Sequence, residues 1–361
     1  MSHPGESLFE WTVEELDREL VARGARVDAE NRFKFKDKEG TPERDAIMAQ
    51  VKELYDSDET PSLNEDLRCI STWELAKILM YKTGKIEING ARGTWGADER
   101  MDFYEITDNR IRKNAGCTAA ICMKDSLLAK KKGFSTLKVK NYGKTFNLCD
   151  CEPFQQQPIF AGPMCTGFLV KEDLLVTAAH FVNEKNVGDL RIVFGFKMMD
   201  ATSAVIQAPN KNIYQGVKLL SRVYNRKDIG GSGSDWALVK LDRNVVGQAV
   251  ATLSTRTLSC GQGVYVIGHP VGLPLKYAPG AHIMDIAGAY FSADLDVYSG
   301  NSGSPVFDSD AHELLGMVVR GDNRDFRWTG NGWLSVVYPN REIYSTGAQC
   351  TRVTEFSEYC R

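Results

Sequence analysis

The chain has 361 residues, 43% of them hydrophobic and 25% charged, which is the composition of an ordinary soluble globular protein with one large or two medium-sized domains. A formal net charge of −3 gives no electrostatic reason to expect nucleic acid or a membrane surface as a partner. No apolar run approaches the roughly 18 residues that a membrane-spanning helix requires.

Residues 1–90 have the pattern of a small, acidic, mostly helical domain. Apolar residues recur at helical spacing in three stretches, and each stretch follows a residue typical of a helix start: 13–21 after Thr12, 46–54 after Pro42, and 73–82 after Ser71. This region contains no recognisable catalytic cluster. We expect it to be an accessory domain that binds a protein partner or regulates the rest of the chain.

Residues 91–361 have a different pattern, which begins after a linker marked by glycines. Short apolar runs, often β-branched, are separated by glycine turns, as at Thr118–Cys122, Arg191–Phe194 and Val264–Ile267. Many short strands at regular spacing predict a β-barrel or a β-sandwich. We therefore expect a second, mainly β domain over residues 91–361.

His180 stands apart among the five histidines of the chain. It closes the run Leu174–His180, an apolar strand that ends in small residues and so leaves room around an imidazole. A histidine at such a place can be a general base, and it can equally be a satisfied core or turn residue. Its interpretation therefore depends on the partners that the chain supplies.

Two aspartates are candidates for the group that would orient this imidazole. Asp235 stands immediately before the apolar run 236–239, where a carboxylate can be buried at the start of a strand. Asp228 lies seven residues earlier and is followed by a glycine-rich stretch, which positions a carboxylate poorly. We favour Asp235, with an ordinary strand-capping role as the alternative.

Ser302 lies in the hexapeptide Gly300-Asn301-Ser302-Gly303-Ser304-Pro305, between two apolar stretches. A serine framed by glycines can approach a substrate closely, and the turn directs the backbone N–H groups of Gly300 and Ser302 into one small space. Fixed donors of this kind form an oxyanion hole, which stabilises the negative charge of a tetrahedral intermediate. Gly/Ser turns alone are common in loops, so this motif needs its two partners.

The three strings occur in the order of the trypsin- and chymotrypsin-like serine peptidases, and each resembles that family. Thr177-Ala178-Ala179-His180 is similar to its Thr-Ala-Ala-His signature, and Asp235-Trp236-Ala237-Leu238 to its Asp-Ile-Ala-Leu. The serine hexapeptide resembles the bacterial, glutamyl-endopeptidase-like branch. The resemblance covers roughly Trp95 to Arg361. It implies a double β-barrel, with His180 and Asp235 in the first barrel and Ser302 in the second.

The resemblance implies a serine endopeptidase that hydrolyses a protein substrate through an acyl-enzyme, with His180, Asp235 and Ser302 as the triad and no cofactor or metal. Zymogens of the family mature when a new N-terminal amine pairs with an aspartate just before the serine. Here that position is Asn301, so this ion pair is not available.

Specificity residues are expected in two places. Asp296 lies six residues before Ser302, where trypsin places the carboxylate of its primary pocket, and this favours an arginine or lysine substrate. Asp296 can instead be structural. Arg320, Gly321 and Arg324 lie near the strand that is similar to the family's substrate-binding strand, where either arginine could receive an acidic side chain.

The nine cysteines and the N-terminus predict a cytoplasmic protein. No secretory signal is visible at Met1–Ser7, and an odd cysteine number fits reduced thiols. Cys165 matches one half of a disulfide found in secreted relatives, but Phe181 replaces the other half.

Cytoplasmic trypsin-like domains fused to helical modules resemble bacterial defence proteins. The alternatives are a non-catalytic protease homologue and a scaffold that acts through its N-terminal helical domain.

Overall fold

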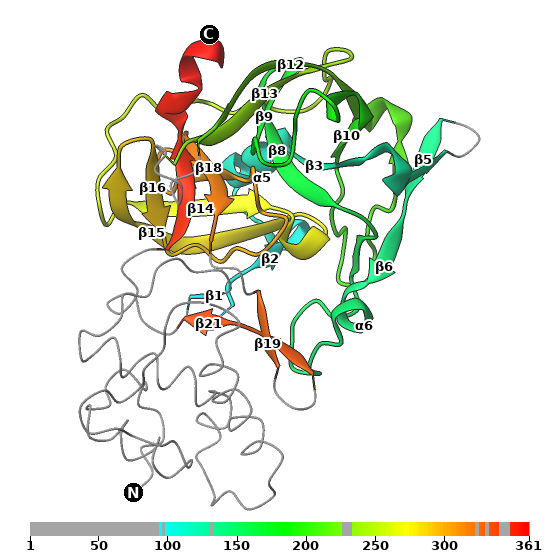
Figure 1. Cartoon of the computed structure of the whole chain (residues 1–361). Coiled ribbons are helices and arrows are strands. Elements are labelled where there is room, and N and C mark those ends of the chain that lie inside the picture. Colours follow the sequence, from blue (N-terminus) through cyan, green and yellow to red (C-terminus); the bar gives the residue numbers. More distant parts are fainter. Residues whose placement is uncertain are drawn as a thin grey trace, which may run out of the picture. The chain divides into compact units, whose positions relative to one another are not determined.

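The structure is a computed structural model of the whole chain (Figure 1). It describes residues 94–95, 98–129, 133–225, 233–321, 325–328, 332–338 and 347–360. These residues all belong to one compact unit, Gly90–Tyr338 and Thr346–Arg361. The helical domain predicted over residues 1–90 lies outside the described residues, and so it stays a prediction.

The first barrel is a closed sheet of six antiparallel strands in the order β10-β12-β13-β9-β8-β3. Apolar side chains fill it, among them Ile121, Ile192 and Leu238, each at most 2% exposed. Its strands are β3 (Thr118–Met123), β8 (Met164–Lys171), β9 (Leu174–Thr177), β10 (Leu190–Phe194), β12 (Ile213–Tyr224) and β13 (Asp235–Leu241).

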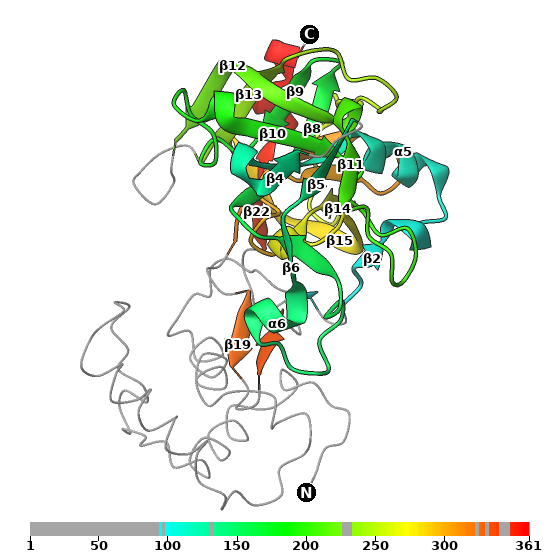
Figure 2. The same ribbon diagram turned by 90° about the vertical axis from the view of Figure 1, so that its right-hand side faces the viewer.

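The second barrel follows the order β14-β17-β18-β22-β16-β15, and β15 pairs back onto β14 to close it. Its strands are β14 (Gly263–Gly268), β15 (Lys276–Ala287), β16 (Tyr290–Ala293), β17 (Pro305–Asp308), β18 (Leu314–Arg320) and β22 (Ala348–Arg352), and β2 (Met101–Asp102) adds to the edge of β15. Figure 2 shows the strands in two groups, with β12, β13 and β9 in one and β14 and β15 in the other. The double β-barrel predicted from the sequence is therefore confirmed.

Apolar contacts join the two barrels. One continuous core contains Leu175 and Trp236 of the first barrel together with Tyr265 and Phe307 of the second. The C-terminal segment adds a second link, because the ring of Phe356 lies 6.1 Å from that of Trp236. Burying an aromatic side chain of this size contributes roughly 1.5–3 kcal/mol, so the shared core fixes the barrels against each other.

The remaining elements surround the barrels. Asp108 caps α5 (Asn109–Cys117) by accepting the N–H of Arg110, and the helix leads directly into β3. The other elements are α6 (Tyr142–Phe146), β1 (Thr94–Trp95), β4 (Leu127–Ala129), β5 (Phe134–Leu137), β6 (Val139–Asn141), β7 (Pro158–Phe160), β11 (Gln207–Pro209), β19 (Phe326–Trp328), β20 (Trp333–Ser335) and β21 (Val337–Tyr338). Short 3₁₀ helices lie at Phe103–Glu105, Lys124–Ser126, Val187–Asp189, Asn210–Asn212, Pro270–Gly272, Val353–Glu355 and Ser357–Cys360.

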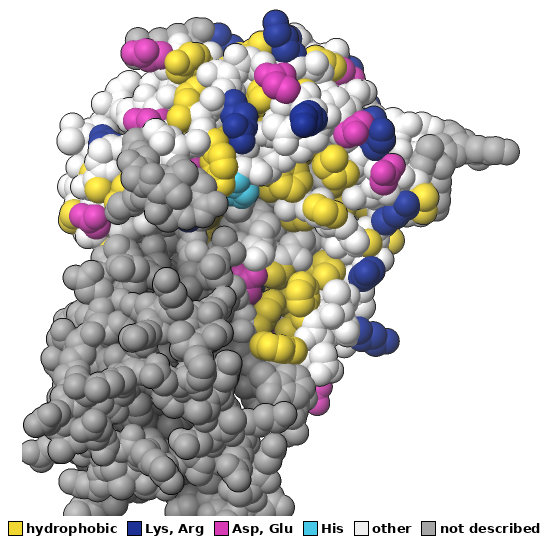
Figure 3. All heavy atoms as spheres, viewed as in Figure 1, with side chains coloured by type: hydrophobic (Ala, Val, Ile, Leu, Met, Phe, Trp, Pro, Cys, Tyr) yellow, Lys and Arg dark blue, Asp and Glu magenta, His cyan; other side chains and the backbone are white. Residues whose placement is uncertain are grey.

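Basic and acidic side chains are interspersed over the described part of the face that Figure 3 shows. Among the described residues, every cysteine is free, including the buried Cys165, Cys350 and Cys360. Burial raises the pKa of the Cys165 thiol, which makes it an inert core residue. No helix in the described ranges is long and apolar enough to cross a membrane.

Candidate active site

His180 follows β9 in a turn whose preceding residues, Ala178 and Ala179, are buried. Its Nδ1 lies 2.8 Å from Oδ2 of Asp235, and its backbone N–H donates to Oδ1 of the same carboxylate at 3.2 Å. A carboxylate accepts hydrogen bonds, so Nδ1 carries the proton and Nε2 keeps a free lone pair. The His180 side chain is 32% exposed, whereas that of Asp235 is 1% exposed. An accessible imidazole is thus held in one tautomer by a buried acid.

Asp235 is itself fixed from the second barrel. It is the first residue of β13, and its backbone N–H donates to Oγ1 of Thr351, a residue of β22, at 3.2 Å. The Thr351 hydroxyl in turn donates to the carbonyl of Asp235 at 3.2 Å. This pair of bonds ties the start of β13 to the other barrel. Asp228, the weaker sequence candidate, lies outside the described residues.

Arg222, which sequence reasoning did not identify, braces the turn that carries His180. From β12, its Nε donates to Val182 O at 2.9 Å and to Ala179 O at 3.2 Å, and its Nη2 donates to Ala179 O at 3.0 Å. Charge-assisted hydrogen bonds of this kind are about twice as strong as neutral ones. The guanidinium therefore holds the backbone on both sides of His180.

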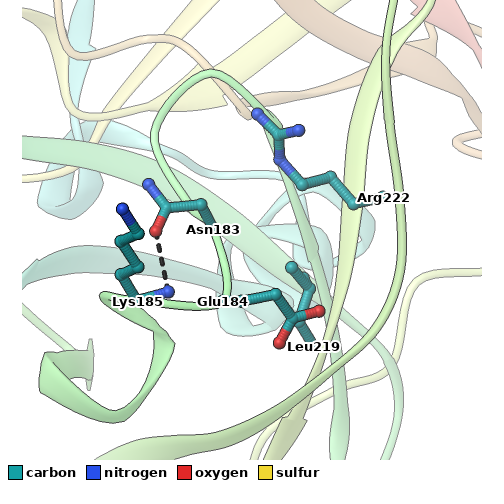
Figure 4. A pocket seen from close by; sticks show the side chains of 5 residues that line it. All are labelled: Asn183, Glu184, Lys185, Leu219 and Arg222. Atoms are coloured by element: carbon teal, nitrogen blue, oxygen red, sulfur yellow. Dashed lines mark hydrogen bonds between the residues drawn. The ribbon is translucent and has the colours of Figure 1, made fainter.

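A pocket of about 390 Å³ lies beside this brace (Figure 4). Leu219 and Arg222 of β12 form one side, and the loop residues Asn183, Glu184 and Lys185 form the other. The loop is locked by a bond from the Lys185 N–H to Oδ1 of Asn183 at 2.9 Å. The pocket is thus a preformed hollow that begins three residues after His180.

Ser302 lies in a turn that is fastened to both barrels. The Thr166 N–H of β8 donates to Ser302 O at 2.9 Å, and the Gly303 N–H donates to Val318 O of β18 at 2.7 Å. Gly303 has φ +83°, and a Cβ there would lie 2.1 Å from Thr166 O and 3.1 Å from the N atom of Ala178. Only glycine fits this contact. The serine turn therefore lies directly against the turn that carries His180.

The backbone N–H groups of Gly300 and Ser302 donate to no acceptor among the residues that the structure describes. Each belongs to a trans peptide unit whose carbonyl is already bonded on the opposite side. Ser299 O accepts the N–H of Val271 at 2.5 Å, and Asn301 O accepts the N–H of Ser304 at 2.8 Å. Within the described part of the chain, no acceptor faces either the Gly300 or the Ser302 N–H. Two such donors beside a serine can stabilise an oxyanion.

Asn301 is a structural residue in this turn. It is 2% exposed, its Oδ1 accepts the N–H of Tyr298 at 3.1 Å, and its Nδ2 donates to Oγ of Ser304 at 3.2 Å. Its own N–H donates to Tyr298 O at 3.0 Å. The amide is thus satisfied inside the loop, with no need of an external amine.

The predicted specificity residues have partners inside the protein. Asp296 is 7% exposed, and its Oδ2 accepts the N–H of Glu99 at 3.3 Å. Arg320 ends β18 and donates from Nη2 to Gly233 O at 2.8 Å. Gly321 follows Arg320 and is partly exposed, and Arg324 lies outside the described residues. The Asp296 carboxylate and the Arg320 guanidinium are thus both engaged by backbone groups of the protein.

A second feature that sequence reasoning missed lies behind the serine loop. The Arg100 side chain is fully buried, donates to both oxygens of Asp98 at 2.8 and 2.6 Å, and stacks 4.2 Å above the ring of Tyr298. The neighbouring Lys276 is paired with Asp102, and burial lowers the pKa of Lys276 to about 8. Asp98 is only two residues from Arg100, but the Tyr298 ring on which the guanidinium stacks is distant in sequence, so no local signal marks Arg100 as a support of the serine loop.

The family comparison agrees with this architecture. Residues 165–317, which include His180, Asp235 and Ser302, match the family described as trypsin-like peptidase domain. This part of the chain is therefore similar to trypsin-like peptidase domains. No curated protein sequence matches the chain significantly.

Three solved structures are similar to the chain at low identity. A Glu endopeptidase in complex with MPD is 17% identical, covers 74% of this chain and 98% of its own, and has a TM-score of 0.42. An inactive mutant of Rv3671c from M. tuberculosis is 14% identical over 74% and 94%, with a TM-score of 0.41. The Vibrio cholerae VesB protease is 15% identical over 72% and 65%, with a TM-score of 0.41.

Proposed function

We propose that this protein is a serine endopeptidase with His180, Asp235 and Ser302 as its catalytic triad. The observation that carries the proposal is the combination of an oriented imidazole with two free backbone donors beside a serine. The oriented imidazole alone, or the two backbone donors alone, could have a purely structural role. Together, within a trypsin-like peptidase domain, they supply a base, a nucleophile and an oxyanion hole.

The chemistry is acyl transfer in two steps. Ser302 Oγ attacks the carbonyl carbon of a peptide bond while Nε2 of His180 takes its proton, and Asp235 stabilises the resulting imidazolium. The oxyanion is held by the N–H groups of Gly300 and Ser302, and His180 returns the proton to the leaving amine. Water then attacks the acyl-enzyme, again through His180, and releases Ser302.

The biological setting is part of the same proposal. Residues 1–90 would bind a protein partner that restrains or recruits a peptidase working in the cytoplasm, as a defence effector would. A protein truncated near Gly90 is expected to fold, to cleave short peptides and to lose its partner. A truncated protein that folds but cleaves no short peptide would show instead that the N-terminal region belongs to the active enzyme.

The test of the activity is cleavage of a peptide library, together with labelling by a fluorophosphonate probe. The wild-type protein is expected to do both, and Ser302→Ala neither. Ser309→Ala, which truncates an exposed serine of the same barrel, serves as the matched control and keeps both activities. A wild-type protein that neither reacts with the probe nor cleaves any peptide would support the non-catalytic homologue.

A further inference from the structure

The turn after β14 lies directly behind the serine loop. Gly300 has φ +93°, and a Cβ on it would lie 2.6 Å from His269 O and 3.3 Å from the N atom of Gly272. The backbone of residues 269–272 is therefore in van der Waals contact with the peptide that carries one of the two free donors. Its conformation decides which way that peptide can point.

Val271 has the least favourable backbone conformation in this turn. Its φ of +46° and ψ of +24° lie in the left-handed region, which a β-branched residue rarely adopts. Such a conformation is energetically unfavourable and persists only where the surroundings enforce it. In return, it directs the Val271 N–H at Ser299 O, 2.5 Å away.

This single hydrogen bond sets the orientation of the peptide between Ser299 and Gly300. The carbonyl of a trans peptide points away from its N–H, so a carbonyl held by Val271 leaves the Gly300 N–H facing the other side. If the peptide turned over, its N–H would face the Val271 N–H, and two donors would oppose each other. The flipped arrangement would also place a carbonyl where an oxyanion must bind.

A second brace holds the far side of Gly300. The Thr166 hydroxyl donates to Gly300 O at 2.9 Å and accepts the N–H of His269 at 3.2 Å. His269 is 1% exposed, its Nδ1–H donates to Leu273 O at 3.0 Å, and its ring stacks on Phe196. Both peptide units around Gly300 are therefore bonded to the turn or to β8.

We propose that Val271 is a positioning residue for the oxyanion hole, which its N–H keeps assembled in the folded chain without an activating cleavage. The inference rests on the proposed function and deepens it, because it concerns how the same site is regulated. Asn301 is satisfied within its own loop.

The test compares two substitutions that differ in the N–H. Val271→Gly keeps the donor and relieves the strain, whereas Val271→Pro removes the donor. We expect kcat of Val271→Pro to fall at least ~100-fold below that of Val271→Gly, the loss typical of one oxyanion donor, with KM changed little. Affinity for a peptide aldehyde, whose adduct carries the oxyanion, should fall in parallel with kcat.

Because proline can also disturb folding, a second variant isolates the atom concerned. Replacing Val271 by its α-hydroxy acid substitutes an ester oxygen for the N–H and keeps the side chain. This variant is expected to melt near the wild-type temperature and to lose at least ~100-fold in kcat. Wild-type kcat and aldehyde affinity in the folded ester variant would overturn the inference. Failure of the proposed function would look different, because the wild-type protein itself would then be inactive.

Discussion

The turns that carry His180 and Ser302 are held by different means. Side chains fix the histidine turn, through the Asp235 carboxylate and the Arg222 guanidinium. The serine turn is fixed mainly by backbone groups of Val271, Val318 and Thr166, to which the Thr166 hydroxyl and the Asn301 amide add side-chain bonds. A single side-chain substitution can therefore change the orientation of the His180 imidazole, the proposed base. The proposed nucleophile depends instead on positions where only glycine, or an unusual backbone angle, fits.

The two arrangements suit their chemical tasks. An imidazole has to stabilise a charge that appears and disappears, and a buried carboxylate does this best. An oxyanion hole needs donors that are already oriented before the charge develops, and backbone N–H groups locked by neighbouring bonds need no reorganisation. Substitutions that disturb only one of the two turns therefore test whether the histidine turn and the serine turn are supported in these different ways.

The largest effect on the histidine side is expected from Asp235→Asn. The amide can no longer accept two hydrogen bonds in the same way, and it favours the wrong imidazole tautomer, so kcat should fall by roughly 10⁴-fold. Asp228→Asn, the matched change on the other candidate, should alter kcat by less than about threefold. The measurement is kcat on one peptide substrate for both variants. Equal losses, or a larger loss for Asp228→Asn, would show that the wrong carboxylate was chosen.

On the serine side, acid should weaken the support of the loop through His269. Burial lowers the pKa of His269 from 6.5 to about 4, so the folded protein holds the neutral ring. The unfolded chain binds a proton below pH 6.5 and the folded one only below about 4, so the stability from the neutral ring is lost as the pH falls across this window. The loss amounts to about 3 kcal/mol.

Urea unfolding between pH 7 and pH 4 measures this effect. His269→Gln removes the titration, so the stability advantage of the wild-type protein should shrink by about 3 kcal/mol on going to pH 4. Parallel pH profiles for the two proteins would mean that His269 is not held neutral. The oxyanion loop would then lack this acid-sensitive support.

Whether a feature of the site could be predicted from the sequence depended on how far apart its residues lie along the chain. The strings at His180, Asp235 and Ser302 are local, and so are the strands that carry them, because apolar runs and glycine turns mark them directly. The bracing groups are not local. Arg222 lies 43 residues from Ala179, and Thr351 lies 116 residues from Asp235 in the other barrel, so only the strand pairing of the first barrel and the packing of the two barrels bring them together. The left-handed Val271 is likewise bonded to a residue distant in sequence, because its N–H donates to Ser299 O.

A smaller effect is expected when the brace on the histidine turn is removed. Arg222→Met keeps much of the side-chain volume and removes the donors to Ala179 O and Val182 O. The turn should loosen, and kcat should fall about tenfold while the pH dependence of kcat/KM shifts with the freed imidazole. Arg222→Lys, which can keep one donor, should recover part of the loss. If kcat and the pH profile stay unchanged in Arg222→Met, the brace has no catalytic role.

The smallest effect concerns Asp296, the proposed floor of the primary specificity pocket. Its carboxylate already accepts the Glu99 N–H at 3.3 Å inside the protein. Part of its charge is thus used inside the protein, so the preference for arginine over glutamate at P1 should be only about tenfold.

The measurement is kcat/KM on two peptides that differ at P1, for the wild-type protein and for Asp296→Asn. The substitution should bring the two values together, chiefly by lowering the value for the arginine peptide. A wild-type preference for glutamate would refute this role and would assign P1 recognition to Arg320, whose Nη2 would have to leave Gly233 O to reach the substrate.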